Sequence, residues 1–151
     1  MSFDDFENSL SEQSTTRFKI TINGSDRILY LQNVCESIEY SQINADGVII
    51  SPVYHEISND VYKKIKNDSE FILIDPQGFI RQINSEKKIS LEKTDIDLSK
   101  ISAIKVNHDE LYCLTNETGI EAMKKLQKRG VENVIFTNKR EISLLVNDKL
   151  Y

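Results

Sequence analysis

Four short apolar runs, each followed by a polar residue, constrain the fold of this chain more than any other feature. The runs are rich in β-branched and aromatic residues, and each is too short for a helix. They occupy residues 47–51, 71–75, 103–107 and 133–137. The stretches between them are long enough for crossover helices, so the pattern predicts an α/β fold with a mainly parallel sheet.

The polar residues that end these runs would lie together on one edge of that sheet. They are Ser51, Asp75, Asn107 and Thr137. Ligands of open α/β sheets bind outside the carboxyl ends of the strands. The sequence therefore predicts that any binding or catalytic site lies at this edge.

A hairpin is predicted ahead of the sheet. Residues 18–23 and 27–32 alternate between apolar and polar, and Asn23-Gly24 stands where the first run ends. This dipeptide between alternating runs is a strong hairpin signal. We expect an antiparallel appendage or lid over residues 17–32, preceded by a polar lead-in over residues 1–16.

The remaining elements are predicted from capping residues and spacing. Ser58 is expected to cap a helix that runs to about residue 66, with Val61 and Ile65 facing inward. A second helix is expected over residues 117–129, with an apolar stripe of Ile120, Met123 and Leu126 and a Glu121–Lys125 pair. A short helix over residues 95–101 and an edge strand over residues 87–93 are also expected.

Composition excludes several classes of protein. The net charge of -5 argues against a nucleic-acid-binding surface. No apolar run approaches the roughly 20 residues that a membrane span needs, and no secretory signal is visible, so we expect a cytoplasmic protein without membrane contact. Cys35 and Cys113 lack the spacing of metal ligands. The chain reads as a single domain.

Two segments carry a resemblance to a known family. Asp75-Pro-Gln-Gly-Phe-Ile-Arg81, followed by Lys105-Val-Asn-His-Asp-Glu110, resembles the PfkB (ribokinase-like) carbohydrate kinases, in particular their archaeal sugar-kinase branch. The resemblance implies a three-layer α/β/α core. Residues 17–151 would then be the central, partial segment of such a domain, with residues 17–32 as its lid-like hairpin.

The resemblance implies roles for the residues after the third run. The family's Asn-x-x-Glu motif organises Mg²⁺ and phosphate, which would assign those roles to Asn107 and Glu110, with Lys105 beside them. Oxygen ligands suit Mg²⁺, and a helix N-terminus favours phosphate. Local sequence alone also allows a helix N-cap in which Glu110 is the third helical residue, a capping box without any ligand.

Three residues of the second run and its turn could belong to the active-site edge or support the loop. They are Asp75, Gly78 and Arg81. An Asp before Pro is often a turn residue, and glycine permits close approach of the backbone. Both alternatives stay open on sequence alone.

The nucleotide loop departs from the family. The family's Thr-x-Gly-x-x-Gly corresponds here to 137–142, where Thr137 matches and Lys139 and Ile142 replace the glycines. The resemblance implies ATP as co-substrate and Thr137 and Lys139 as nucleotide-binding residues. A side chain where the backbone needs a positive φ is costly, so ATP binding at this loop is in question.

The resemblance to the PfkB kinases also implies a function. We expect an ATP-dependent sugar or nucleoside kinase in truncated form, because the family's Gly-Ala-Gly-Asp motif with its catalytic base would lie beyond Tyr151. No catalytic residue is therefore assigned in this chain, which we expect to be inactive alone. The alternatives are a non-catalytic pseudo-kinase that binds a partner and an unrelated α/β enzyme that uses Asp75 and His55. Unpaired sheet edges would favour self-association.

Overall fold

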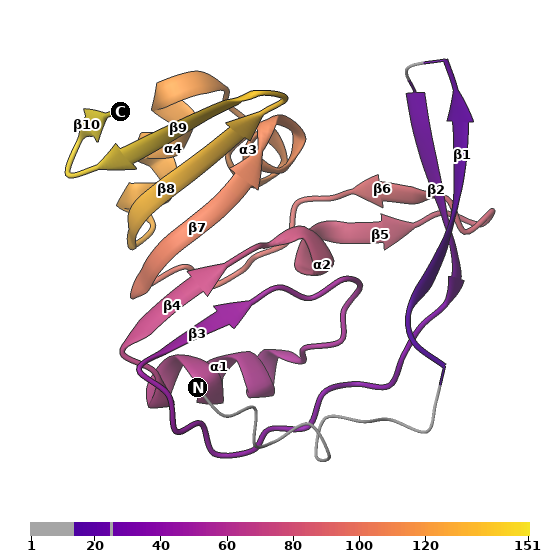
Figure 1. Ribbon diagram of the computed structural model, residues 1–151, viewed down its shortest axis with the longest axis horizontal. Helices are drawn as coiled ribbons and strands as arrows, with labels where there is room; N and C mark the ends of the chain where they lie inside the picture. Colours follow the sequence, from indigo (N-terminus) through magenta and orange to yellow (C-terminus); the bar gives the residue numbers. More distant parts are fainter. Residues whose placement is uncertain (1–13, 25) are drawn as a thin grey trace.

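The four apolar runs form neighbouring parallel strands, as predicted. The structure is a computed structural model that describes residues 14–24 and 26–151 (Figure 1). The strands are β3 (Gly47–Ile50), β4 (Phe71–Ile74), β7 (Ile101–Asn107) and β8 (Val131–Asn138). The antiparallel strands β9 (Glu141–Val146) and β10 (Lys149–Leu150) extend the sheet, whose order is β10-β9-β8-β7-β4-β3.

One row of side chains across this sheet forms the centre of the core. Its members stand in register on five strands and are at most 1% exposed. They are Ile50, Ile74, Ile104, Val134 and Leu145. Helices α1 (Asn59–Asp68), α3 (His108–Thr115) and α4 (Gly119–Lys128) contribute to the same buried cluster. Right-handed crossovers between strands that step in one direction place their helices on one face.

The alternate residues of the strands face away from these helices. Ile49 is 73% exposed and Phe71 is 49% exposed, and Leu73, Ile135 and Leu144 are only partly buried. Strands of parallel sheets are normally covered on both faces. This second, more open face is where the third layer of an α/β/α fold would pack.

Helix α1 begins as predicted. The Ser58 hydroxyl accepts a hydrogen bond from the Val61 N–H at 3.2 Å. Tyr62 and Ile65 are buried, whereas Val61 is only partly buried, so the inward face is turned by one residue from the predicted one.

The predicted helix over residues 95–101 is wrong. The segment has no helical turn, and β7 already begins at Ile101. One Asp97 oxygen accepts hydrogen bonds from the Ser99 N–H and hydroxyl at 3.0 and 2.7 Å. Side chains that bond the nearby backbone in this way compete with helix formation. The same bonds, after that from Lys66, lower the pKa of Asp97 to about 2.

Helix α4 differs in its details from the prediction. It begins at Gly119 and not at residue 117, so the Glu117 carboxylate lies before the helix and pairs with Lys125 at 2.8 Å. Glu121 pairs with Lys124 instead, at 2.9 Å. Ala122, Met123 and Leu126 form the buried stripe, while Ile120, which the sequence placed inward, is 37% exposed.

The hairpin is confirmed and lies outside the large sheet. Strands β1 (Arg17–Asn23) and β2 (Asp26–Asn33) form their own antiparallel pair, and Gly24 in the turn has φ +62°. In Figure 1 the hairpin stands on the side toward which the arrowheads of β7 and β8 point. Residues 1–13 of the predicted lead-in lie outside the described part of the chain.

A second small sheet links the hairpin to the body. It pairs β5 (Arg81–Ile83) with β6 (Ile89–Leu91), the shortened form of the predicted edge strand. An isolated bridge joins Tyr30 to Lys88 beside this sheet. Among the described helices, none is long and apolar enough to cross a membrane.

The one-turn helix α2 (Gln77–Ile80) yields a test of packing. A Cβ added to Gly78 would lie 2.4 Å from both the carbonyl carbon and the oxygen of Pro52. We expect Gly78→Ala to lower the free energy of unfolding by about 2 kcal/mol, because backbone must move to make room. Chemical denaturation measures this change.

Gly47→Ala is the matched control for this prediction. Its added Cβ would meet the flexible Phe71 side chain at 3.1 Å, and Gly47 has no positive φ. A smaller loss is expected. Equal losses for Gly78→Ala and Gly47→Ala would contradict the packing account.

Candidate functional site

The junction between β7 and α3 lies at the centre of the predicted edge. Asn107 is the N-cap of α3, and its Oδ1 accepts a hydrogen bond from the Glu110 N–H at 2.9 Å. The Asn107 N–H in turn donates to Glu110 Oε2 at 2.8 Å. These reciprocal bonds form the capping box that the sequence left open as an alternative.

The capping box determines what Asn107 can offer a ligand. Its side-chain oxygen already accepts a bond from the helix. Nδ2 is the donor atom of this side chain, and Oδ1 keeps one further lone pair. A donor at the beginning of a helix suits a phosphate oxygen and not a metal ion.

The Glu110 side chain is buried at this junction and is only 2% exposed. Burial raises the pKa of its carboxyl, and the negative charge of Asp75 acts in the same direction. The hydrogen bond from the Asn107 N–H, together with the charges of Lys105 and Arg81, opposes this shift. Glu110 is therefore a carboxyl group whose ionised form is less favoured than in solvent.

Lys105 and Asp75 form an ion pair across neighbouring strands. The distance between Lys105 Nζ and Asp75 Oδ2 is 3.0 Å, with side-chain exposures of 36% and 18%. The other Asp75 oxygen accepts the Gln77 N–H at 3.2 Å and so supports the turn after β4. Two of the predicted site residues, Asp75 and Lys105, are thus brought together. One Asp75 oxygen supports the turn, and the other binds Lys105 at the carboxyl edge.

Arg81 and Gly78 both hold the loop after β3, and the Gly78 carbonyl oxygen accepts the His55 N–H at 3.0 Å. Arg81 donates to the Val53 carbonyl oxygen at 3.0 Å and to Gln77 Oε1 at 2.6 Å. Burial lowers the pKa of its guanidinium, against the opposing charges of Glu110 and Asp75. These contacts hold the loop after β3 against the turn after β4.

Thr137 lies beside Asn107, and Lys139 lies farther out. Thr137 pairs with Asn107 in the register of β8 and β7. Lys139 and Arg140 form a two-residue turn between the paired Asn138 and Glu141, and Lys139 has φ +55°. A tight hairpin turn therefore stands where the family's glycine-rich loop is expected. A hollow of about 310 Å³ lies at this turn, between residues 138 and 141.

Glu56 is a buried residue that the sequence analysis did not single out. It is 6% exposed, and its carboxylate accepts hydrogen bonds from the Val53 and Tyr54 N–H groups at 2.8 and 2.6 Å. Nearby, His55 Nε2 lies 2.6 Å from the Arg81 carbonyl oxygen. No periodicity in this loop distinguishes Glu56 from an exposed acid.

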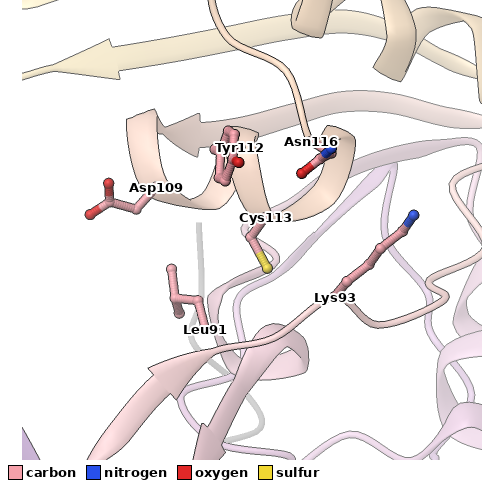
Figure 2. A pocket seen from close by; sticks show the side chains of 6 residues that line it. All are labelled: Leu91, Lys93, Asp109, Tyr112, Cys113 and Asn116. Atoms are coloured by element: carbon pink, nitrogen blue, oxygen red, sulfur yellow. The ribbon is translucent and has the colours of Figure 1, made fainter.

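A separate hollow of about 550 Å³ lies beside the outer face of α3. Figure 2 shows side chains of α3 on one side of it and, on the other, Leu91 at the end of β6 and Lys93 just after that strand. The lining residues are Leu91, Lys93, Asp109, Tyr112, Cys113 and Asn116. Burial raises the pKa of the Cys113 thiol, which disfavours the nucleophilic thiolate. No predicted site residue lines this hollow.

The described residues provide no protein cage for a metal ion. Within residues 14–24 and 26–151, no group of three or more His, Cys, Asp or Glu side chains is arranged to hold one. Mg²⁺ commonly keeps its waters and binds one or two carboxylates together with phosphates of the substrate. At this edge the carboxylates that would serve such a mode are Asp75, which is 18% exposed, and Glu110, which is 2% exposed.

Several solved structures with a similar fold are described as kinases. No family profile and no curated protein matches the sequence. A sulfate complex of a pyrophosphate-dependent kinase of the ribokinase family has a TM-score of 0.80 at 20% identity, and the match covers 91% of this chain and 52% of that one. A pyrophosphate-dependent kinase of that family with a pyrophosphate analogue and myo-inositol gives 0.78 at 21%, covering 91% and 51%.

A third match is Arabidopsis thaliana ribokinase with ribose and ATP. Its TM-score is 0.61 at 16% identity, and the match covers 91% of this chain and 47% of that one. These likenesses show a ribokinase-like α/β fold with a mostly parallel sheet and an N-terminal hairpin, as the sequence predicted. The chain spans about half the length of the solved structures that it matches.

The buried Glu110 predicts a pH-dependent stability. Its pKa is higher in the folded state, so its ionisation costs stability as the pH rises from 4.5, its ordinary value, through the folded-state value. Glu110→Gln retains the capping bond without the charge. We expect equal stability near pH 4 and an advantage of the variant on the order of 1 kcal/mol at pH 8.

Denaturation at both pH values measures this difference. Asp109→Asn removes a charge from an exposed neighbour in the same helical turn and is the control. An advantage of Glu110→Gln that does not grow with pH would contradict the assigned cost of burial.

Proposed function

We propose that this chain is the phosphate-binding part of a small-molecule kinase of the ribokinase type. The whole protein would transfer a phosphoryl group to a hydroxyl of a sugar or related polyol. The observation that carries the proposal is the arrangement of Lys105, Asn107 and Thr137 at the carboxyl edge, beside the N-terminus of α3.

These groups provide complementary contacts for a polyphosphate. Asn107 Nδ2 and the Thr137 hydroxyl supply neutral donors, and α3 supplies the positive end of its dipole. Lys105 supplies a charge that Asp75 holds in place at 3.0 Å. Phosphoryl transfer relies mainly on positioning and on stabilisation of the transferring charge, which such groups provide.

We further propose that pyrophosphate is the donor and ATP the alternative. The turn at Lys139 and Arg140 is too tight to be an open loop of backbone amides, but it presents two cationic side chains. Side-chain cations suit a small, highly charged donor. Two of the matched kinases are described as pyrophosphate-dependent, which supports this choice.

Phosphoryl transfer also needs Mg²⁺ and a general base. A bound Mg²⁺ would neutralise charge on the donor, with Glu110 and Asp75 as the carboxylates that hold its waters. No residue of this chain is assigned as the base. We therefore expect turnover only from the whole protein, with the hairpin over residues 17–32 as a lid above the acceptor.

A non-catalytic binding module is the second candidate. The capping box and the burial of Glu110 give both residues a structural role without any ligand. Such a protein would retain the fold and lack affinity for pyrophosphate and ATP.

Calorimetric titration of the full-length protein with pyrophosphate and Mg²⁺ tests the proposal. Asn107→Asp keeps an efficient N-cap but replaces the donor Nδ2 by an anionic oxygen. We expect binding at least tenfold weaker, with an unchanged melting temperature. Losses of this size are typical when a ligand's charge loses a hydrogen-bonding donor.

Lys128→Ala removes an exposed cation from α4 and is the matched control for charge. It should leave the affinity unchanged. Equal affinities of Asn107→Asp and the parent would contradict the phosphate site, and absence of binding for both pyrophosphate and ATP would favour the binding module.

A further inference from the structure

The buried Glu56 carboxylate joins both ends of the β1–β2 hairpin to the body. Its Oε1 accepts a hydrogen bond from the Thr16 hydroxyl at 2.9 Å, directly before β1. The same Thr16 oxygen accepts the Cys35 N–H at 3.1 Å, just after β2. One carboxylate therefore holds the chain where it enters the hairpin and, through Thr16, where it leaves.

The other Glu56 oxygen holds the loop that follows β3. It accepts the N–H groups of Val53 and Tyr54, and the Glu56 carbonyl oxygen accepts the Ile38 N–H at 2.7 Å. All of these donors come from the hairpin ends, the segment after β2 or the loop. Loss of the carboxylate should therefore loosen these segments and leave the six-stranded sheet intact.

The loop held by Glu56 is itself fixed to the carboxyl edge. The His55 N–H donates to the Gly78 carbonyl oxygen at 3.0 Å, and Arg81 donates to the Val53 carbonyl oxygen at 3.0 Å. The Arg81 guanidinium also lies 5.1 Å from the centre of the Phe18 ring on β1. Glu56 thus connects the hairpin to the turn that carries Asp75.

Beyond this base, the hairpin has little support from the body. Ile20 and Ile22 on β1 are 57% and 69% exposed. β2 touches the β5–β6 sheet at Tyr30 and Lys88, and the Leu31 N–H donates to the Lys87 carbonyl oxygen at 2.9 Å. Figure 1 shows the hairpin projecting from the body. Its placement relative to the carboxyl edge therefore depends on the contacts at its base.

We propose that Glu56 is a positioning residue that sets the angle of the β1–β2 hairpin relative to the carboxyl edge. That the positioned hairpin serves as a lid above an acceptor rests on the proposed function. The positioning itself does not require any ligand.

Spin-label distances in the full-length protein test the placement. One label replaces the exposed Thr21 on β1 and the other the exposed Lys128 on α4, with Cys35 and Cys113 changed to serine. We expect the distance distribution to become at least twofold wider in Glu56→Gln, because an amide cannot satisfy the N–H and hydroxyl donors together. Glu132→Gln, an equal charge change at an exposed position of β8, should leave the width unchanged.

Hydrogen exchange of the same variants measures which segments loosen. Hydrogen bonds to charged groups are strong enough that we expect about tenfold faster exchange in residues 17–33 of Glu56→Gln. Exchange in β4, β7 and β8 should not change. Thr16→Val, a milder variant that retains Glu56, should speed exchange in the hairpin and spare the amides of Val53 and Tyr54.

An unchanged distance distribution in Glu56→Gln would overturn the proposal. Equal acceleration in the hairpin and the six-stranded sheet would also overturn it, because Glu56 would then stabilise the whole fold. Neither measurement uses pyrophosphate, so failure of this proposal can be distinguished from failure of the proposed function.

Discussion

The reciprocal hydrogen bonds between Asn107 and Glu110 connect the core of this protein to its candidate site. β7 is buried along most of its length and must end where a helix begins. The first N–H groups of a helix lack partners within it, and a buried helix end without a cap is unfavourable. Asn107 and Glu110 satisfy this requirement, and in doing so they bring a donor and a carboxyl to the carboxyl edge.

The candidate site lies where that edge meets the more open face of the sheet. The alternation along the strands places Asp75, Lys105, Asn107 and Thr137 on the face opposite α1, α3 and α4. The same face carries the exposed side chains of Ile49 and Phe71. Any polypeptide that packs on this face would also enclose the site.

Much of the fold was predictable because its signals are local. The apolar runs, the Asn23-Gly24 turn and the Ser58 cap each act within a few residues, and the structure confirms them. The helix over residues 95–101 failed because the Asp97 side chain bonds Ser99. Contacts between residues distant in sequence could not be predicted from local patterns. Thr16 and Glu56, which share a hydrogen bond, are 40 positions apart.

The candidate site was predictable in part for the same reason. Local spacing indicated the capping role of Asn107 and Glu110, and the resemblance to the PfkB kinases implied a ligand role. The structure shows the capping role, and the ligand role remains a proposal. The ion pair between Asp75 and Lys105 follows from strand register, which the sequence did not specify. The contacts of Arg81 with Val53 depend on how two loops pack.

Backbone amide chemical shifts during titration with pyrophosphate test the central claim most directly, since they locate a bound ligand without assuming activity. The account predicts shifts concentrated at residues 105–110 and 137–140, at the carboxyl edge. Shifts concentrated instead at Leu91, Lys93, Tyr112 and Cys113, in the hollow of Figure 2, would contradict it.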